Sequence, residues 1–213
     1  MFRLSVISIM LCLFAISAVQ AEYYAVLITG DTPPGEALGP KTWDGGSDLP
    51  GFDEFWNDTF LMWEMLWQYG WKNENIFVLF GNGIDWWFPN DRYWGDRYND
   101  PPWNIDHITD DGAYYQDVVD IFNYLDGIMT DSDYLFVWTF DHGNPGANLQ
   151  LMDQVMWDYE FAAIMPEHYS NRVFWMQQCF SGGFIDNLHN VHTVMLTACS
   201  ASQMAGPADN TKP

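Results

Sequence analysis

The chain has 213 residues, of which 29 are acidic and 7 are Lys or Arg, so its net charge at pH 7 is −22. A surface this negative repels nucleic acid and anionic lipid, and we expect neither as a partner. Apolar residues make up 48% of the chain, which is enough for a large core and excludes a disordered protein.

The first 21 residues have the pattern of a secretory signal peptide. One basic residue, Arg3, precedes an apolar stretch from Leu4 to Ala18, and small residues surround a cleavage point after Ala21. This stretch is short for a membrane-spanning helix, and no later segment reaches about 18 uninterrupted apolar residues. We therefore expect residues 22–213 to form one domain that is secreted, periplasmic or at the cell surface, without membrane contact after cleavage.

Strands and helices alternate along this domain. Apolar runs predict strands at residues 23–29, 75–81, 134–140, 173–176 and 193–197. Apolar residues at helical spacing predict helices at residues 52–69, 113–125, 157–165 and 184–189, with a short hairpin near residues 149–152. Asp110 or Asp111 is expected to cap the second helix. This alternation predicts an α/β fold, a three-layer α/β/α sandwich with a mainly parallel central sheet.

A long loop between the second strand and the second helix is rich in aspartate. Its acidic residues are Asp85, Asp91, Asp96, Asp100, Asp106, Asp110 and Asp111. Oxygen-rich loops can hold Ca²⁺, but this spacing matches no known Ca²⁺ loop. We expect no cofactor and no catalytic metal, with Ca²⁺ bound by residues 85–111 as the alternative.

Two of the predicted core strands end in residues that can carry out covalent chemistry. The strand at 173–176 leads through two glutamines to Cys179 and a Ser-Gly-Gly turn, and the strand at 134–140 leads to His142 and Gly143. A single cysteine is more often a buried structural residue than a nucleophile. Parallel neighbouring strands, however, would bring the imidazole and the thiol to the same edge of the sheet.

The segments FVWTFDHG and VFWMQQCFSGG resemble the His-Gly and Cys blocks of the caspase-like (clan CD) cysteine peptidases, closest to the legumain-type branch. The resemblance extends to the order of elements from Tyr23 to about Ser200. It implies a caspase-like fold and a cysteine endopeptidase that acts on peptide or protein substrates. The domain of these peptidases continues beyond the strand that ends near Cys199, so we expect this domain to be incomplete at its carboxyl end.

The resemblance also implies roles for individual residues. Cys179 would attack the peptide carbonyl as a thiolate, and His142 would protonate the leaving amine. The N–H groups of Gly143 and Cys179 would form the oxyanion hole, in which the loss of one donor typically costs about 10²–10³ in rate. Gly143 also suits this position because it has no side chain to block a substrate.

The substrate pocket departs from the resemblance. Caspases and legumain-type enzymes use an arginine there, but residues 22–91 contain no arginine. Acidic residues lie in this region instead, and we include Asp31, Asp58 and, after the last strand, Ser200 in a candidate pocket for Lys or Arg side chains. The alternative is that these acids are simply solvated, as expected in so acidic a chain.

Other functions and pairings stay open at this point. The same dyad could belong to a catalytically silent or transpeptidating member of the fold, and the 12 Trp residues are compatible with an extracellular glycan-binding module. Cys199 could pair with Cys179 in an oxidising compartment, but a bridged Cys179 could not act as a nucleophile. The remaining histidines do not end core strands and are expected at the surface: His107, His168, His189 and His192. Nothing in the sequence indicates an oligomeric state.

Overall fold

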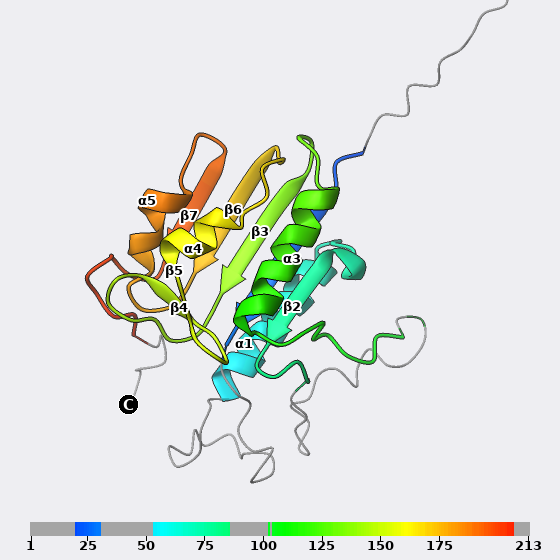
Figure 1. Ribbon diagram of the computed structural model, residues 1–213. Helices are drawn as coiled ribbons and strands as arrows, with labels where there is room; N and C mark the ends of the chain where they lie inside the picture. The colour runs from blue at the N-terminus through cyan, green and yellow to red at the C-terminus, as the bar shows by residue number, and fades with distance from the viewer. Residues whose placement is uncertain (1–19, 31–52, 86–101, 103, 207–213) are drawn as a thin grey trace, which may run out of the picture.

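A five-stranded, fully parallel sheet forms the centre of the molecule (Figure 1). The computed structural model describes residues 20–30, 53–85, 102 and 104–206. In chain order the strands are β1 (Tyr23–Thr29), β2 (Ile76–Phe80), β3 (Tyr134–Thr139), β6 (Asn171–Met176) and β7 (Thr193–Thr197). In space their order is β2-β1-β3-β6-β7. Two further strands, β4 (Asn148–Gln150) and β5 (Val155–Trp157), form a separate antiparallel hairpin.

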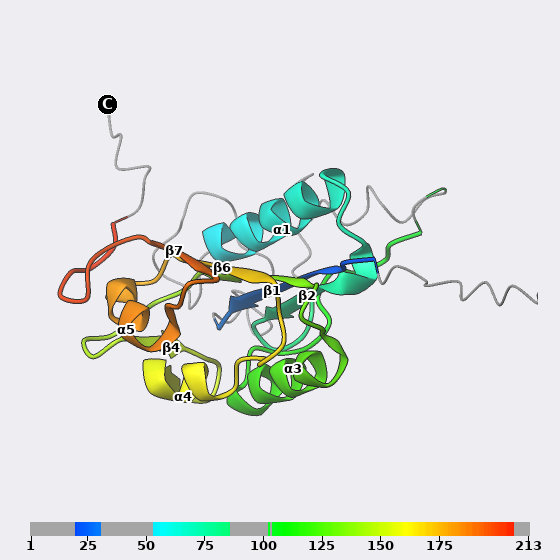
Figure 2. The same cartoon turned by 90° about the horizontal axis from the view of Figure 1, so that it is seen from above.

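Helices cover both faces of this sheet (Figure 2). Helix α1 (Asp53–Gln68) lies on one face, and α3 (Tyr115–Ile128), α4 (Asp158–Ala163) and α5 (Ile185–Leu188) lie on the other. Two short 3₁₀ helices, η1 (Asn73–Asn75) and η2 (Ser181–Phe184), precede β2 and α5. The predicted three-layer α/β/α sandwich is confirmed. Enclosure on both faces explains the continuous apolar runs of β1, β2 and β3, whereas β7 at the edge of the sheet leaves Val194 and Leu196 exposed.

Each side of the sheet has its own apolar core. On one side, aromatic residues of α1 spaced at helical intervals, such as Trp56, Phe60 and Trp63, pack fully buried against Leu27 and Val78 of the sheet. On the other side, α3 buries Val118, Phe122 and Leu125 among residues that alternate along β1 and β3. The period of two in the strands and the period of about 3.6 in the helices therefore direct apolar side chains into these two cores, one on each side of the sheet.

The expected cap of α3 is wrong. The residue before this helix is Tyr114, and the N–H of Tyr115 donates to the carboxylate of Asp153 at 3.0 Å. Asp110 instead lies beside β2, where its N–H donates to the carbonyl of Val78 at 2.9 Å and its carboxylate accepts from the N–H of Val78 at 2.8 Å. The outer edge of β2 has backbone groups that need partners, and the Asp110 segment supplies them.

This contact changes the acidity of Asp110. The residue keeps much of its surface exposed, but its carboxyl group lies against the strand edge. Loss of water around this group, partly offset by the hydrogen bond from Val78, raises the pKa of Asp110 to about 6.

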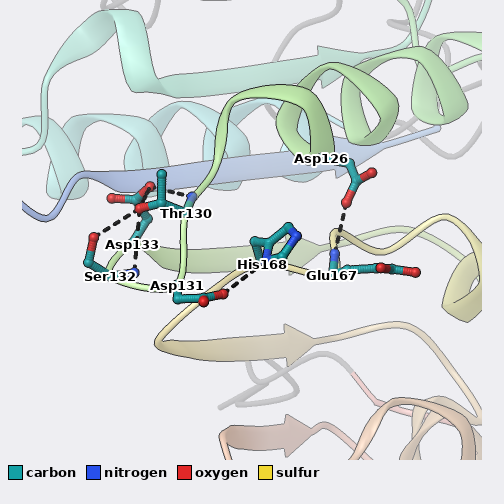
Figure 3. Close-up of polar contacts among 7 residues, drawn as sticks. All are labelled: Asp126, Thr130, Asp131, Ser132, Asp133, Glu167 and His168. Atoms are coloured by element: carbon teal, nitrogen blue, oxygen red, sulfur yellow. Dashed lines mark hydrogen bonds and ion pairs between the residues drawn. The ribbon is translucent and has the colours of Figure 1, made fainter.

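Carboxylates tie the loops together at the amino end of the sheet (Figure 3). Asp133 is 3% exposed and precedes β3. It accepts hydrogen bonds from the N–H of Thr130 at 2.7 Å, from the Thr130 hydroxyl at 2.9 Å and from the N–H of Glu22 at 2.8 Å. One buried side chain thus joins the α3–β3 turn to the start of β1.

Two exposed contacts link the end of α3 and the turn after it to the loop before β6 (Figure 3). Asp126 accepts from the N–H of Glu167 at 2.8 Å, and Asp131 lies 2.9 Å from Nδ1 of His168. The hydrogen bond to Asp131, together with the negative charge of that residue, raises the pKa of His168.

Two expectations from the sequence concern the signal peptide and membrane-spanning helices. Residues 1–19, which contain most of the predicted signal peptide, lie outside the described residues. Among the helices that the structure describes, none is long and apolar enough to cross a bilayer.

Candidate active site

The His142 and Cys179 segments leave neighbouring parallel strands at the same level. In the β3–β6 pairing, Thr139 is opposite Met176. The ladder continues one step further, because the N–H of Gln177 donates to the carbonyl of Thr139 at 2.9 Å. His142 and Cys179 each come three residues after this last pair, so both are at the carboxyl edge of the sheet, where open α/β sheets have their sites.

The two segments touch at Gly143. A Cβ at this position would overlap the carbonyl oxygen of Cys179 and would lie 3.1 Å from Cγ of Gln178. Standard bond lengths then place the Cα atoms of His142 and Cys179 within roughly 10 Å of each other. Glycine is required here for close packing of the His142 turn (residues 141–146) on the Cys179 turn (residues 179–184).

Several contacts position His142. Its ring is exposed and makes an edge-to-face contact with Phe55 of α1, with ring centroids 5.6 Å apart and planes at 87°. Its carbonyl accepts from the N–H of Gln150 in β4 at 3.3 Å, and its own N–H donates to the Asp141 carboxylate. The turn is therefore held by α1, by the β4–β5 hairpin and by its own aspartate.

A strained turn follows Cys179. Phe180 has φ 60°, in the left-handed region, which costs a residue with a side chain roughly 1–2 kcal/mol. Its N–H donates to the carbonyl of Gln203 at 2.9 Å, and η2 begins at the next residue. Cys179 itself is half-buried, with its sulfur 3.7 Å from the carbonyl of Ala205. Strain of this kind concentrates at functional sites.

The two N–H groups expected to form an oxyanion hole belong to these two turns. Within the described part of the chain, no protein acceptor is bonded to the N–H of Gly143 or of Cys179. Neither N–H group is therefore committed to an acceptor within the described residues.

Residues 127–205 match the model of the Peptidase C13 family. The matched stretch runs from the end of α3 through β7 and contains both His142 and Cys179. Because it covers less than half of the chain, it supports the resemblance to caspase-like cysteine peptidases for part of the domain. No curated protein matches the chain.

A small pocket lies under the His142 turn, within the matched stretch except for Ile28. It is lined by Ile28, Thr139, Phe140, Asp141, His142, Leu149, Gln150 and Gln178. Gln178 is 1% exposed, and its Oε1 accepts from the Thr139 hydroxyl at 2.7 Å. This bond joins the residue before Cys179 to the end of β3. Sequence analysis missed this contact, although two polar residues at the ends of apolar strands were a signal for it.

Phe55 was also missed as a site residue. It appears in the sequence only as one member of the aromatic stripe of α1. Its position at the start of the helix brings it to the carboxyl edge of the sheet, where it also contacts Phe140 with centroids 4.8 Å apart.

The residues of the candidate substrate pocket are less well defined. Asp31 lies outside the described residues. Asp58 is exposed on α1, one turn after Phe55, and Ser200 is exposed after β7, where its hydroxyl donates to Gln203 Oε1 at 2.9 Å. The specificity prediction therefore stays a prediction.

Most of the Asp-rich loop 85–111 also lies outside the described residues, and Ca²⁺ binding there stays untested. Asp85, at its start, accepts from the N–H groups of Ile108 at 3.0 Å and Thr109 at 2.8 Å. In the part of the chain that is described, no three His, Cys, Asp or Glu side chains group as metal ligands do. The four histidines expected at the surface are exposed: His107, His168, His189 and His192.

The tryptophans give little support to a glycan platform. Of those in the described residues, Trp56, Trp63 and Trp138 are buried, and Trp67, Trp71, Trp157 and Trp175 are half-buried. A sugar-binding surface needs exposed rings, so these residues serve mainly as core.

Proposed function

We propose that the chain is a secreted cysteine endopeptidase that hydrolyses peptide bonds with Cys179 as nucleophile and His142 as its proton-transfer partner. The observation that carries this proposal is the packing of the two turns. The β3–β6 register and the contact between Gly143 and the Cys179 carbonyl hold a thiol and an imidazole at one edge of the sheet. The partial match to a cysteine peptidase family supports the same assignment.

The reaction needs two steps. The Cys179 thiolate attacks the peptide carbonyl, and the N–H groups of Gly143 and Cys179 stabilise the oxyanion that forms. His142 gives a proton to the leaving amine, and a thioester remains on Cys179. Water, deprotonated by His142, then attacks the thioester and releases the carboxylic acid product and the thiol.

The assignment is tested by substitution of each member of the dyad. Cys179→Ala and His142→Ala are each expected to reduce peptide cleavage to background and to leave circular dichroism spectra unchanged, because both side chains lie at a turn outside the core. Labelling by an acyloxymethyl ketone probe should require Cys179. The matched control is Cys199→Ser, which should keep cleavage under reducing conditions. Full cleavage by Cys179→Ala would refute the assignment.

The fate of the thioester separates hydrolysis from transpeptidation. Mass spectrometry of products formed with an added amine peptide identifies which nucleophile resolves the intermediate. Hydrolysis predicts carboxylic acid products, whereas a dominant ligated product would assign the transpeptidating alternative instead.

We further propose that the substrate pocket prefers Lys or Arg side chains over Asn or Asp. The support for this preference is charge: Asp58 is exposed on α1 one turn after Phe55, whose ring contacts the His142 ring, so its carboxylate would attract a cationic substrate side chain. A peptide library cleaved by the unmodified protein and by Asp31→Asn and Asp58→Asn tests the proposal. Equal turnover of Asn and Arg peptides by the unmodified protein would exclude it.

A further inference from the structure

The thiol of Cys199 lies directly against the Cys179 turn. Its sulfur accepts a hydrogen bond from the N–H of Phe180 at 3.1 Å and lies 3.7 Å from the carbonyl oxygen of Gln178. These two backbone groups flank Cys179 on both sides. Standard bond lengths therefore put the Cys199 sulfur within roughly 5.5 Å of the Cys179 Cα.

Both thiols also contact the same short segment after β7. The Cys199 sulfur lies 3.0 Å from the carbonyl of Gln203, and the Cys179 sulfur lies 3.7 Å from the carbonyl of Ala205. Both cysteines are unpaired and half-buried. The segment after β7 thus folds back over the Cys179 turn and contacts both thiols.

We propose that Cys179 and Cys199 form a reversible disulfide that switches the active site off. The disulfide itself is inferred from the geometry of the two thiols. Only its consequence, the loss of peptidase activity, rests on the proposed function. In an oxidising compartment the protein would be latent, and a thiol reductant would activate it.

The chemistry needs a low-molecular-weight disulfide, such as oxidised glutathione, as the oxidant. The Cys179 thiolate attacks one sulfur of this disulfide, which forms a mixed disulfide and releases one thiol. The Cys199 thiolate then attacks the Cys179 sulfur and displaces the second thiol. In total, two protein thiols lose two protons and two electrons, and the oxidant is reduced to two thiols.

The test uses the full chain, reduced and then incubated with oxidised glutathione. Intact mass and peptide mapping should show that the Cys179 and Cys199 thiols are lost, that neither residue carries glutathione, and that one cross-linked peptide pair contains both residues. Peptide cleavage should fall to background and return fully with dithiothreitol. Peptide mapping also distinguishes this bond from any that involves Cys12 of the predicted signal peptide.

The matched variant is Cys199→Ser, which keeps a hydrogen-bond acceptor for Phe180. It should stop at the mixed disulfide and carry one glutathione on Cys179. Unmodified protein that retains this adduct, or that keeps both thiols free, would overturn the proposal whatever its activity. If the cross-link forms but the reduced protein cleaves no peptide, the disulfide stands and the peptidase assignment fails.

Discussion

The two ends of the central sheet are built in different ways. At the amino end, Asp133 is buried and accepts three hydrogen bonds from Thr130 and Glu22. At the carboxyl end, the His142 ring is exposed, Gly143 packs on a backbone carbonyl, and Phe180 adopts a left-handed conformation. The amino end satisfies its polar groups, whereas the carboxyl end keeps strain and available N–H groups.

This difference means that the amino end of the sheet mainly stabilises the fold, whereas the carboxyl end is suited to chemistry. A buried carboxylate that accepts three hydrogen bonds from its own protein stabilises the fold and is enclosed away from solvent. A strained turn with available donors costs stability but can bind a developing negative charge. Substitutions at the two ends should therefore have opposite signatures, with activity changed at one end and stability at the other.

Outside the Cys179–His142 dyad, the largest effect on activity is expected for Gly143→Ala. The added Cβ would overlap the Cys179 carbonyl, so the two turns must move apart and the dyad would be misaligned. We expect peptide cleavage to fall by about 100-fold or more, with a loss of about 1–3 kcal/mol in the free energy of unfolding. The matched control is Gly127→Ala in α3, where a Cβ meets nothing within 4 Å. Normal cleavage by Gly143→Ala would remove the steric argument for the site.

The largest effect on stability alone is expected for Asp133→Ala. The N–H groups of half-buried Glu22 and exposed Thr130 and the Thr130 hydroxyl would lose their acceptor, and we expect the free energy of unfolding to fall by about 1–3 kcal/mol in urea denaturation. The kcat of the folded variant should stay normal because Asp133 is at the other end of β3 from His142. Asp131→Ala, which removes an exposed carboxylate of the same turn, is the control and should be nearly neutral. A selective loss of kcat in Asp133→Ala would contradict the separation.

A smaller effect on stability, which depends on pH, is expected for Asp110 at the outer edge of β2. The pKa of Asp110 is raised from 3.8 to about 6, so the folded state holds this proton more tightly than the unfolded state. Its contribution to stability is therefore fully present below about pH 4 and is lost as the pH rises through 6. An asparagine at this position cannot ionise, so Asp110→Asn should not lose stability as the pH rises from about 4 through 6. The Tm of the variant should therefore rise relative to that of the unmodified protein over this pH range. A difference that does not change with pH would contradict the assignment.

The smallest effect is expected for His168→Gln. The neighbouring Asp131 raises the pKa of His168, so the pairing stabilises the fold at pH values below the ordinary histidine pKa and is lost as the pH rises through the higher folded value. Both side chains are exposed, so the Tm difference should be slight and should vanish in high salt. Peptide cleavage should not change, because the pair lies at the amino end of the sheet.

Several features of the site could be predicted from the sequence because they are local. His142 and Cys179 each follow an apolar run, and such runs are recognisable as core strands wherever they lie in the chain. The cap of α3 could not be predicted in this way. Asp110 and Asp111 are close to the helix in sequence, but the donor Tyr115 is satisfied by Asp153, which is 38 residues away.

The sequence by itself determined the five strands of the central sheet, most of the helices, the layered α/β class and the two candidate catalytic residues, because apolar periodicity and glycine turns act over a few residues. Only the tertiary structure decided that β3 and β6 are neighbours, that Phe55 meets the His142 ring, and that the Cys199 sulfur lies against the Cys179 turn. These contacts join segments far apart in the chain. They depend on the path of the whole chain through the sheet, which no local pattern encodes.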